Sequence, residues 1–147
     1  MKDKIKIGGV EVTRLKVLPT EGGCVMHGLK KGDKDFAGFG ETYFSSIEAG
    51  HIRGWKRHRE MTLNLVVVAG EVRFVLIEEK DQIHSREFDE VILSPKHNYA
   101  RLCVPPGIWV AFQGVANPIS ILANIANIEH DPSEADQVSI DHFDFDW

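Results

Sequence analysis

Residues 63–77 read LNLVVVAGEVRFVLI, and this stretch decides the fold class. Its first part, LNLVVV at 63–68, is a short apolar run of the kind found in buried strands. Ala69 and Gly70 interrupt the run, and residues 71–77 then alternate between apolar and other side chains. Such alternation places every second side chain on the same face of a strand. The stretch therefore predicts two successive strands in a β protein.

Further strand-forming runs occur on both sides of this stretch. They are separated by Gly, Pro, Asn and Asp, and they occupy residues 10–17, 39–47, 88–93, 101–104, 109–112 and 119–128. Helices have little support, because only DPSE at 131–134 fits a short turn, with Asp131 as its N-cap. The segments around residues 22–23 and at 30–34 are predicted to be loops. Short strands between such turns are typical of an all-β sandwich or barrel.

Length and composition restrict the class of protein further. The chain has 147 residues, of which 43% are hydrophobic and 27% charged. This fits one folded domain and excludes a disordered, collagen-like or coiled-coil protein. No apolar run approaches the roughly 18 residues of a membrane span, and no apolar run follows the charged start Met1–Lys6, so we expect neither a membrane span nor a signal peptide. Cys24 and Cys103 indicate two reduced thiols in a cytoplasmic protein or, alternatively, one disulfide.

Charge is distributed unevenly along the chain. The net charge is −5, yet six of the nine residues at 51–59 are His, Lys or Arg, whereas the last Lys or Arg is Arg101 and seven acids follow it. Overall acidity argues against broad nucleic-acid binding, which needs a basic face. The basic cluster at 51–59 suits a small anion. The alternative interpretation is a solvated edge strand decorated with charge.

Two stretches resemble one family of sugar-nucleotide enzymes. Residues 52–58 and 63–72, IRGWKRH and LNLVVVAGEV, resemble the segment of dTDP-4-dehydrorhamnose 3,5-epimerases that reads Arg-Gly-Leu-His, then a Lys-Leu-Val strand, then Gly-Glu-Val. Residues 102–112, LCVPPGIWVAF, resemble that family's IPxGFAHGF stretch, and residues 138–147 resemble its WNDxxxGIxW ending. Residues 52–58 are also similar to the Arg-Gly-x-His-x-His motif of sugar-nucleotide 3,4-ketoisomerases, which are short chains as well.

The resemblance extends from about Gly40 to the C-terminus and implies an RmlC-like cupin, an all-β jelly roll of two sheets. We therefore expect a single cupin domain over 1–147, with an N-terminal strand and loops at 1–38, the jelly-roll core at 39–128 and an acidic, aromatic tail at 129–147. The tail ends in DHFDFDW, which predicts an edge strand or an arm that docks its aromatic side chains on the body or on a partner. The family also implies a homodimer, with the tail and strand 10–17 as candidates for exchange.

The residues that the epimerases use for catalysis are mostly replaced. In that family a His removes a proton beside the C4 ketone, a Lys stabilises the enolate oxygen, a Tyr reprotonates the opposite face and an Asp orients the His. The corresponding positions in this chain are Lys56, Leu63 or Asn64, the neighbourhood of Ala123, and Asp141. The family's standard mechanism therefore does not carry over directly.

The metal-binding motifs of cupins are also incomplete. Their ligand positions, counted from Gly70, correspond to Lys56, His58, Leu63 and Val110, so that one ligand of four remains. One imidazole is too few to hold a divalent ion. We expect no metal and no other cofactor.

Proton abstraction beside a ketone needs a base whose pKa lies near the working pH and a donor for the developing oxyanion. On a strand, Lys56 and His58 share one face while Arg57 and Arg59 share the other. With an unperturbed pKa of about 6.5, His58 is the better base and Lys56 the donor. Tyr43 and Asp141 complete the candidate catalytic residues, and the alternative is that Lys56 and His58 only line a solvated rim.

The candidate binding residues are three arginines and one tryptophan. Arg53 matches a substrate contact in the epimerases, and a guanidinium suits a diphosphate by bidentate hydrogen bonding. The alternative for Arg53 is an ion pair with an acid such as Glu41. Arg57 and Arg73 are further candidate cations, and Trp109 could either stack on the ligand or belong to the core.

Three functions remain open. The first is an enzyme resembling dTDP-4-dehydrorhamnose 3,5-epimerase, an epimerase or isomerase that transfers a proton beside the C4 ketone of a nucleotide sugar in polysaccharide biosynthesis. The second is a binding cupin that has lost the catalytic His, Lys and Tyr. The third is a cupin whose cavity serves dimerisation or another small ligand, since fold does not determine function.

Overall fold

The computed structural model describes residues 5–79 and 87–147, so residues 1–4 of the charged N-terminal stretch lie outside it. The strands are β1 (Glu11–Arg14), β2 (Val17–Thr20), β3 (Gly23–Met26), β4 (Glu41–Glu48), β5 (Ile52–His58), β6 (Leu63–Ala69), β7 (Val72–Ile77), β8 (Phe88–Leu93), β9 (Ala100–Val104), β10 (Trp109–Gly114), β11 (Ile119–Ala126) and β12 (Ala135–Gln137). Two 3₁₀ turns, η1 (Pro132–Glu134) and η2 (Ile140–His142), are the helical elements of the described part. All but one of the runs expected to form strands do so within two residues of the expected ends.

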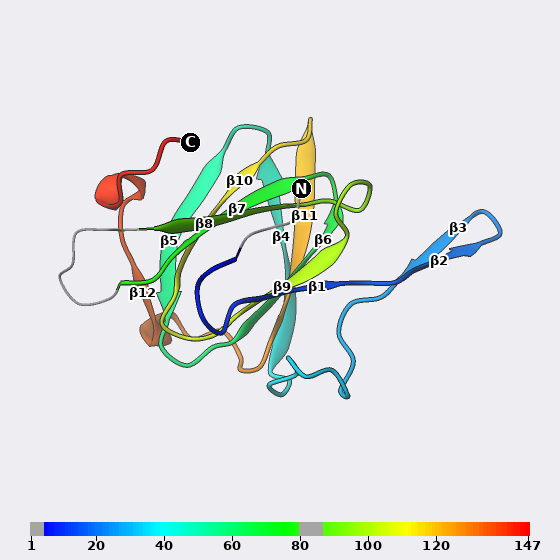
Figure 1. The fold of residues 1–147 in the computed structure, drawn as a ribbon, viewed down its shortest axis with the longest axis horizontal. Coiled ribbons are helices and arrows are strands. Elements are labelled where there is room, and N and C mark those ends of the chain that lie inside the picture. Colours follow the sequence, from blue (N-terminus) through cyan, green and yellow to red (C-terminus); the bar gives the residue numbers. More distant parts are fainter. Residues whose placement is uncertain (1–4, 80–86) are drawn as a thin grey trace.

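Two five-stranded antiparallel sheets form the body of the protein (Figure 1). Their strand orders are β1-β9-β6-β11-β4 and β12-β5-β10-β7-β8. The inward side chains of the two sheets meet in one core, in which Leu65 and Val67 of β6 pack with Phe74 and Leu76 of β7. Burial of this apolar area between the sheets is the main source of stability. The expected all-β jelly roll is confirmed.

The stretch 63–77 crosses from one sheet to the other. β6 lies at the centre of the first sheet and β7 lies in the second. Between them Gly70 has a φ of +78°, a conformation that residues with a Cβ rarely adopt. A Cβ at Gly70 would also lie 2.8 Å from the Cα of Ser120. The interruption seen in the sequence is therefore the tight crossing that lets both apolar runs face the same core.

The N-terminal segment differs from expectation. The run 10–17 does not form one strand, because β1 ends at Arg14 and pairs with β9, whereas Val17 already belongs to β2. Residues 22–23 are not part of an open loop but of a hairpin, in which β2 pairs with β3 and Gly22 takes a φ of +75° in the turn. The hairpin projects from the body as an arm (Figure 1).

The C-terminal tail builds a second core on the outer face of the second sheet. Phe143 is buried between Trp55 and Trp109, with ring-centroid distances of 5.2 and 5.7 Å. Phe145 and Trp147 continue this layer over Phe88 and Trp55. The tail thus docks its aromatic side chains on the body, and the edge strand of this region is the preceding β12.

The basic stretch at 51–59 forms an inner strand. β5 lies between β12 and β10, and the backbone of His58 pairs with Ala135. The interpretation of this stretch as a solvated edge strand is therefore wrong. Within residues 5–79 and 87–147, no helix has the length and apolar character needed to cross a membrane.

Removing the Phe143 ring should destabilise the protein. Its side chain is 2% exposed, and replacing a buried phenylalanine by alanine costs about 3 kcal/mol or more. We expect Phe143→Ala to lower the free energy of unfolding by about that amount in urea titrations, while Asp144→Ala, at the exposed neighbouring position, leaves it nearly unchanged. Equal unfolding midpoints for both variants would contradict the docked tail.

Candidate active site

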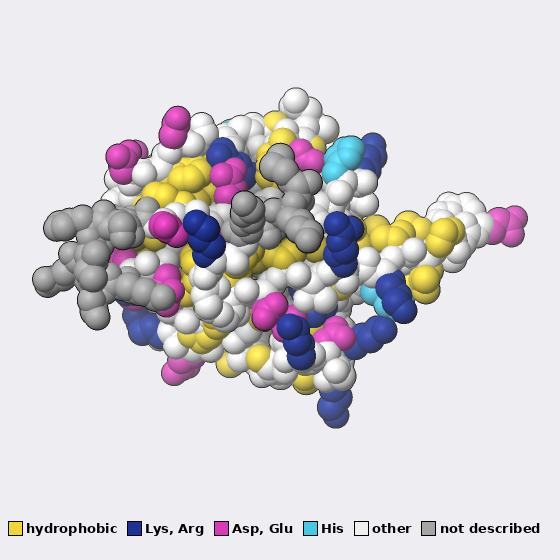
Figure 2. All heavy atoms as spheres, viewed as in Figure 1, with side chains coloured by type: hydrophobic (Ala, Val, Ile, Leu, Met, Phe, Trp, Pro, Cys, Tyr) yellow, Lys and Arg dark blue, Asp and Glu magenta, His cyan; other side chains and the backbone are white. Residues whose placement is uncertain are grey.

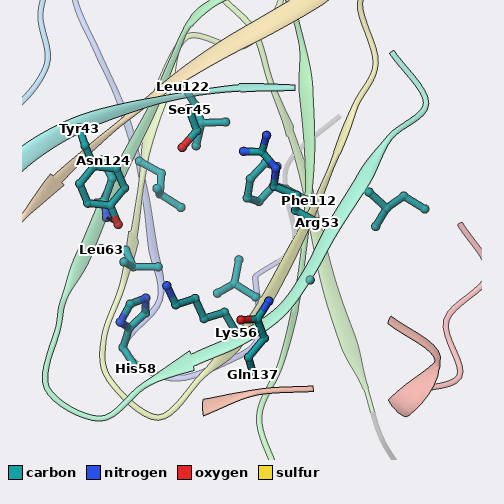
Figure 3. Close-up of a pocket in the computed structure, with 14 residues that line it drawn as sticks. Tyr43, Ser45, Arg53, Lys56, His58, Leu63, Phe112, Leu122, Asn124 and Gln137 are labelled. Atoms are coloured by element: carbon teal, nitrogen blue, oxygen red, sulfur yellow. Dashed lines mark hydrogen bonds between the residues drawn. The ribbon is translucent and has the colours of Figure 1, made fainter. Parts of the chain in front are cut away.

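A cavity of about 440 Å³ lies between the two sheets, and side chains from both sheets line it (Figure 3). Its polar lining residues are Tyr43, Ser45, Arg53, Lys56, His58, Asn124 and Gln137. Its apolar lining includes Leu63, Leu65, Val110, Phe112 and Leu122. The volume is that of a typical small-molecule pocket, and the mixture of apolar wall and few polar groups is typical of such sites.

A bulge in β5 aims its side chains into this cavity. Lys56 lies opposite Val110 and Arg53 lies opposite Phe112, so three steps along β5 match two along β10. The extra residue reverses the alternation, and Arg53 and Lys56 consequently line the same cavity. The bulge needs Gly54, because a Cβ there would collide with the Cβ of Ala111.

Lys56 and His58 lie on the cavity face of β5, as strand alternation predicts. Figure 3 shows them side by side at one end of the cavity, with Tyr43 and Asn124 across from them. In the part of the chain that the structure describes, the Lys56 ammonium forms no hydrogen bond or ion pair. A cation with no partner of its own is available to a ligand that carries a negative or developing negative charge.

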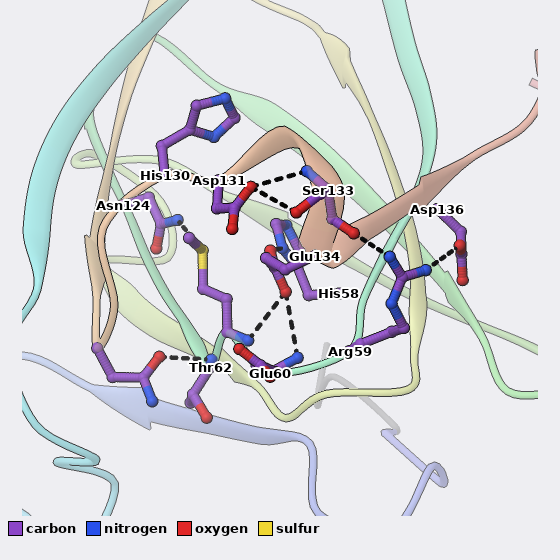
Figure 4. A network of polar contacts seen from close by, with 12 residues as sticks. His58, Arg59, Glu60, Thr62, Asn124, His130, Asp131, Ser133, Glu134 and Asp136 are labelled. Carbon is purple, nitrogen blue, oxygen red and sulfur yellow. Dashed lines mark hydrogen bonds and ion pairs between the residues drawn. The ribbon is translucent and has the colours of Figure 1, made fainter.

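His58 is paired with Glu134, a residue that sequence reasoning missed. Nδ1 of the ring is hydrogen-bonded to Oε1 of Glu134, and both side chains are buried, with exposed fractions of 5% and 6%. The other carboxylate oxygen accepts hydrogen bonds from the backbone N–H groups of Glu60 and Met61, at 3.1 and 3.3 Å (Figure 4). Both oxygens of this buried carboxylate therefore have hydrogen-bond partners, and one of these partners is the candidate base His58.

The surroundings favour a neutral imidazole beside an ionised carboxylate. Burial lowers the pKa of His58, and the nearby charge of Lys56 adds to this, against the opposing hydrogen bond and charge of Glu134. Burial alone would raise the pKa of Glu134, but the hydrogen bonds from His58 and from the Glu60 and Met61 amides outweigh it and hold the pKa below its usual range. At neutral pH His58 can therefore accept a proton.

Tyr43 lies in the cavity with its hydroxyl already engaged. The hydroxyl accepts a hydrogen bond from the Asn124 side-chain amide at 2.8 Å and lies 3.9 Å from the Met61 sulfur, to which it donates. Burial raises the pKa of Tyr43. The phenol accordingly stays protonated and is a weaker acid than an exposed tyrosine.

Arg53 lies at the exposed side of the cavity. Its guanidinium donates to the backbone carbonyl of Ser46 at 2.7 Å and lies over the Phe112 ring, 5.8 Å from the centroid. Glu41, the partner considered in the alternative interpretation, instead accepts a hydrogen bond from the backbone of His130. The Arg53 charge therefore stays available beside the cavity.

Two candidate binding residues lie on the opposite face of the second sheet. Trp109 is 3% exposed and belongs to the second core, because alternation along β10 turns it away from Val110 and the cavity. The Arg57 guanidinium lies 4.6 Å from the Trp109 ring centroid and forms an ion pair with Asp136 at 2.9 Å. The structure does not bring Arg57 or Trp109 into the cavity.

Two further candidates also lie away from the cavity. Arg73 points outward from β7, where it pairs with Glu90 and covers the Phe145 ring. Asp141 is exposed on η2 and does not contact His58. The carboxylate expected there comes from Glu134, seven residues earlier. The N-cap signal of Asp131 correctly predicted the turn that carries Glu134, but it contained no information on which strand the turn would contact.

The positions of the cupin metal motif do converge on the cavity. Lys56, His58, Leu63 and Val110 all line it, so the correspondence drawn from the sequence holds in space. Among the described residues, no group of three or more His, Cys, Asp or Glu side chains is placed to hold a metal ion. Of these four positions, Lys56 and His58 are the two that carry titratable side chains.

The sequence matches no protein-family model and no curated protein sequence. Solved structures do match. A dTDP sugar isomerase from Desulfovibrio desulfuricans is 31% identical with a TM-score of 0.86, over 92% of this chain and 87% of that one. A dTDP-4-dehydrorhamnose 3,5-epimerase from Sulfolobus tokodaii is 22% identical with a TM-score of 0.78, over 97% and 84%. ChmJ, a 3'-monoepimerase from Streptomyces bikiniensis in complex with dTDP-quinovose, is 13% identical with a TM-score of 0.81, over 92% and 72%. The last two support the fold alone.

The His58–Glu134 pair should make the protein less stable in acid. With the pKa of both groups lowered in the folded state, the unfolded chain binds more protons, below about pH 6.5 for the His and below about 4.5 for the Glu. We expect the free energy of unfolding to fall between pH 7.5 and 5.5. The double variant His58→Gln/Glu134→Gln, an uncharged pair of amides, should show a smaller fall. Identical pH dependence in urea titrations would contradict the pKa directions.

Proposed function

Since the chain belongs to the RmlC-like cupin family, we propose that it is a dTDP-sugar epimerase or isomerase that transfers a proton on a carbon beside a C4 ketone. The observation that carries this proposal is the pair at the end of the cavity. A neutral His58, held by a buried carboxylate, lies beside a Lys56 ammonium that has no partner of its own among the described residues. This is a base next to an oxyanion donor, which enolate chemistry requires.

In the proposed reaction His58 removes the proton from C3, and the C–H electron pair forms a C3=C4 double bond. The C4 oxygen becomes an enolate oxygen, which Lys56 stabilises and protonates to give an enediol. The C3 hydroxyl then gives its proton to the now neutral Lys56, which restores the ammonium, C3 becomes the ketone, and the His58 imidazolium returns its proton to C4. No oxidant or metal is needed, because the ketone migrates by proton transfers alone.

The roles differ in position from those of the resembling epimerases. In those epimerases the base corresponds in position to Lys56, and the lysine corresponds to Leu63 or Asn64. In this chain the proposed base, His58, lies two residues further along β5, and the proposed cation, Lys56, occupies the position of the family's base. We favour ketone migration over epimerisation for two reasons. The 31% identical structure is a dTDP sugar isomerase. In addition, epimerisation needs an acid on the opposite face, and Tyr43 has its proton engaged by Met61 and its pKa raised.

Arg53 is proposed to bind the diphosphate of the ligand. Its guanidinium lies beside the cavity, on the same side of β5 as Lys56. A guanidinium binds phosphate oxygens by paired, charge-assisted hydrogen bonds. We also propose a cytoplasmic location, which fits a nucleotide-sugar substrate and the two free cysteines, Cys24 and Cys103.

A homodimer is proposed on the basis of the projecting arm. Val17, Leu18 and Val25 on β2 and β3 are 41%, 46% and 51% exposed, and Figure 2 shows hydrophobic side chains along the arm. A hairpin with exposed apolar side chains that stands away from its own core gains stability when a second chain covers it. The expected occupant is the body of a second copy, as in a symmetric exchange of arms.

Solvent exchange tests the catalytic proposal. With a dTDP-4-keto-6-deoxyhexose in D₂O, we expect the wild-type chain to incorporate deuterium at C3 or C4. His58→Asn and Lys56→Met should each slow incorporation by about 100-fold or more. His97→Asn, at an exposed histidine outside the cavity, should have no effect. Binding without exchange in the wild type would support the alternative of a non-catalytic binding cupin.

Calorimetric titration with dTDP tests the role of Arg53. Loss of a charge-assisted contact to phosphate should raise the Kd of Arg53→Ala about tenfold or more, because such contacts contribute about 1.5–3 kcal/mol. Arg73→Ala, on the outer face of the sheet, provides the matched control and should bind like the wild type. Equal affinities for both variants would exclude Arg53 from the binding site.

Sedimentation velocity tests the dimer. We expect the wild-type chain to sediment as two copies and the arm variant Leu18→Asp/Val25→Asp as one, because each aspartate would be buried without a partner at the interface. Ile92→Asp, a similarly exposed apolar position on β8, should remain dimeric. A wild-type mass of one chain would contradict the proposal.

A further inference from the structure

We propose that Glu134 is the positioning residue of this site: it keeps the proton of the neutral imidazole on Nδ1 of His58, so that Nε2 is the nitrogen that accepts the substrate proton. This inference rests on the proposed role of His58 as the base. It assigns a function to a residue in the C-terminal segment that no sequence motif indicated.

The first step of the argument concerns the carboxylate. Oε1 of Glu134 contacts Nδ1 of His58, and Oε2 accepts from two backbone N–H groups, those of Glu60 and Met61. An ionised carboxylate can only accept hydrogen bonds. The nitrogen of His58 that faces Oε1 must therefore carry the hydrogen, and Nε2 must be unprotonated in the neutral ring.

The second step concerns the rigidity of the acid. Glu134 ends the η1 turn, whose first residue follows the N-cap Asp131. The backbone N–H of Arg59 donates to the Glu134 carbonyl at 2.9 Å, and the Arg59 guanidinium bonds to the Ser133 carbonyl and to Asp136 (Figure 4). These bonds hold the segment after β5 and the η1 turn in fixed positions relative to each other. A side chain held at both oxygens and along its backbone fixes the orientation of its partner.

The third step concerns the direction in which the ring points. Nδ1 is directed at the buried carboxylate, and the rest of the ring lines the cavity beside Lys56 (Figure 3). With Nδ1 occupied, the basic nitrogen is the one on the cavity side of the ring. Burial of the pair keeps water from competing for either contact.

The substitution Glu134→Gln has an unusual consequence here. The two backbone donors require an oxygen, so the amide should turn its oxygen toward Glu60 and Met61 and its NH₂ toward His58. An NH₂ group donates, so Nδ1 would have to accept and the proton would move to Nε2. The variant would retain shape and hydrogen bonds while holding the imidazole in the wrong tautomer. In serine proteases, replacing the Asp that orients the catalytic His by Asn also leaves the His in the wrong tautomer, and it lowers kcat by about 10⁴.

Nitrogen-15 NMR of the ligand-free full chain measures the tautomer directly. We expect Nδ1 to be the protonated nitrogen of His58 in the wild type and Nε2 in Glu134→Gln. The kcat for solvent exchange should fall about 10³-fold or more, with little change in KM, because Glu134 does not touch the ligand site. Asp144→Asn, at an exposed acid of the tail, should change neither the tautomer nor kcat.

The outcomes separate this inference from the proposed function. An Nε2-protonated His58 in the wild type, which requires no variant, would overturn the inference. So would an unchanged tautomer in a folded Glu134→Gln. If the tautomer inverts as expected but the wild type catalyses no exchange on any dTDP-keto sugar, the positioning role stands and the proposed enzyme activity fails. Inversion together with the loss of kcat supports both.

Discussion

The close approach of Gly54 to Ala111 is the constraint on which the site depends. It allows one residue of β10 to face two residues of β5, and the strand changes the direction of its side chains at that point. Trp55 consequently turns to the outer face, where it is fully buried and its indole donates to the Ile140 carbonyl. Arg53 and Lys56 turn to the inner face. The absence of a Cβ at Gly54 therefore allows Trp55 to enter the second core and lets Arg53 and Lys56 face the cavity. Any side chain at this position would disturb one of these two arrangements.

The fold was largely predictable because its signals are local. Apolar runs and alternation mark most strands, and the apolar run at 63–68 followed by Gly70 marks the crossing between the sheets. The arm was missed because β2 and β3 are short and bury little. Their register is set by the turn at Gly22, whereas the residues VLPT and GCVM have no clear alternation. The inner position of β5 was also missed, since the strand that covers its edge, β12, has only three residues.

The site was predictable only in part. Lys56 and His58 follow from strand alternation, but the same alternation without a bulge would have put Arg53 on the face of Arg57. Trp109 and Arg73 could be assigned to either face until the register with neighbouring strands was known. Glu134 lay beyond sequence reasoning for another reason: its partner is 76 residues away, and the contact depends on how the tail returns to β5. Asp141 matched the family's orienting acid in sequence, whereas Glu134 is the acid that contacts His58 in the structure.

The return of the tail to β5 also has a consequence for how the protein is made. A chain is synthesised from its N-terminus, and domains begin to fold while synthesis continues. The body of both sheets could form once β11 has left the ribosome, but β5 then still presents a free edge and His58 has no carboxylate partner. Only the segment from Glu134 onward supplies both, and the rings of Phe143 and Trp147 close the outer face after that. The edge of β5 and the partner of His58 are therefore supplied by a segment that is synthesised after β11.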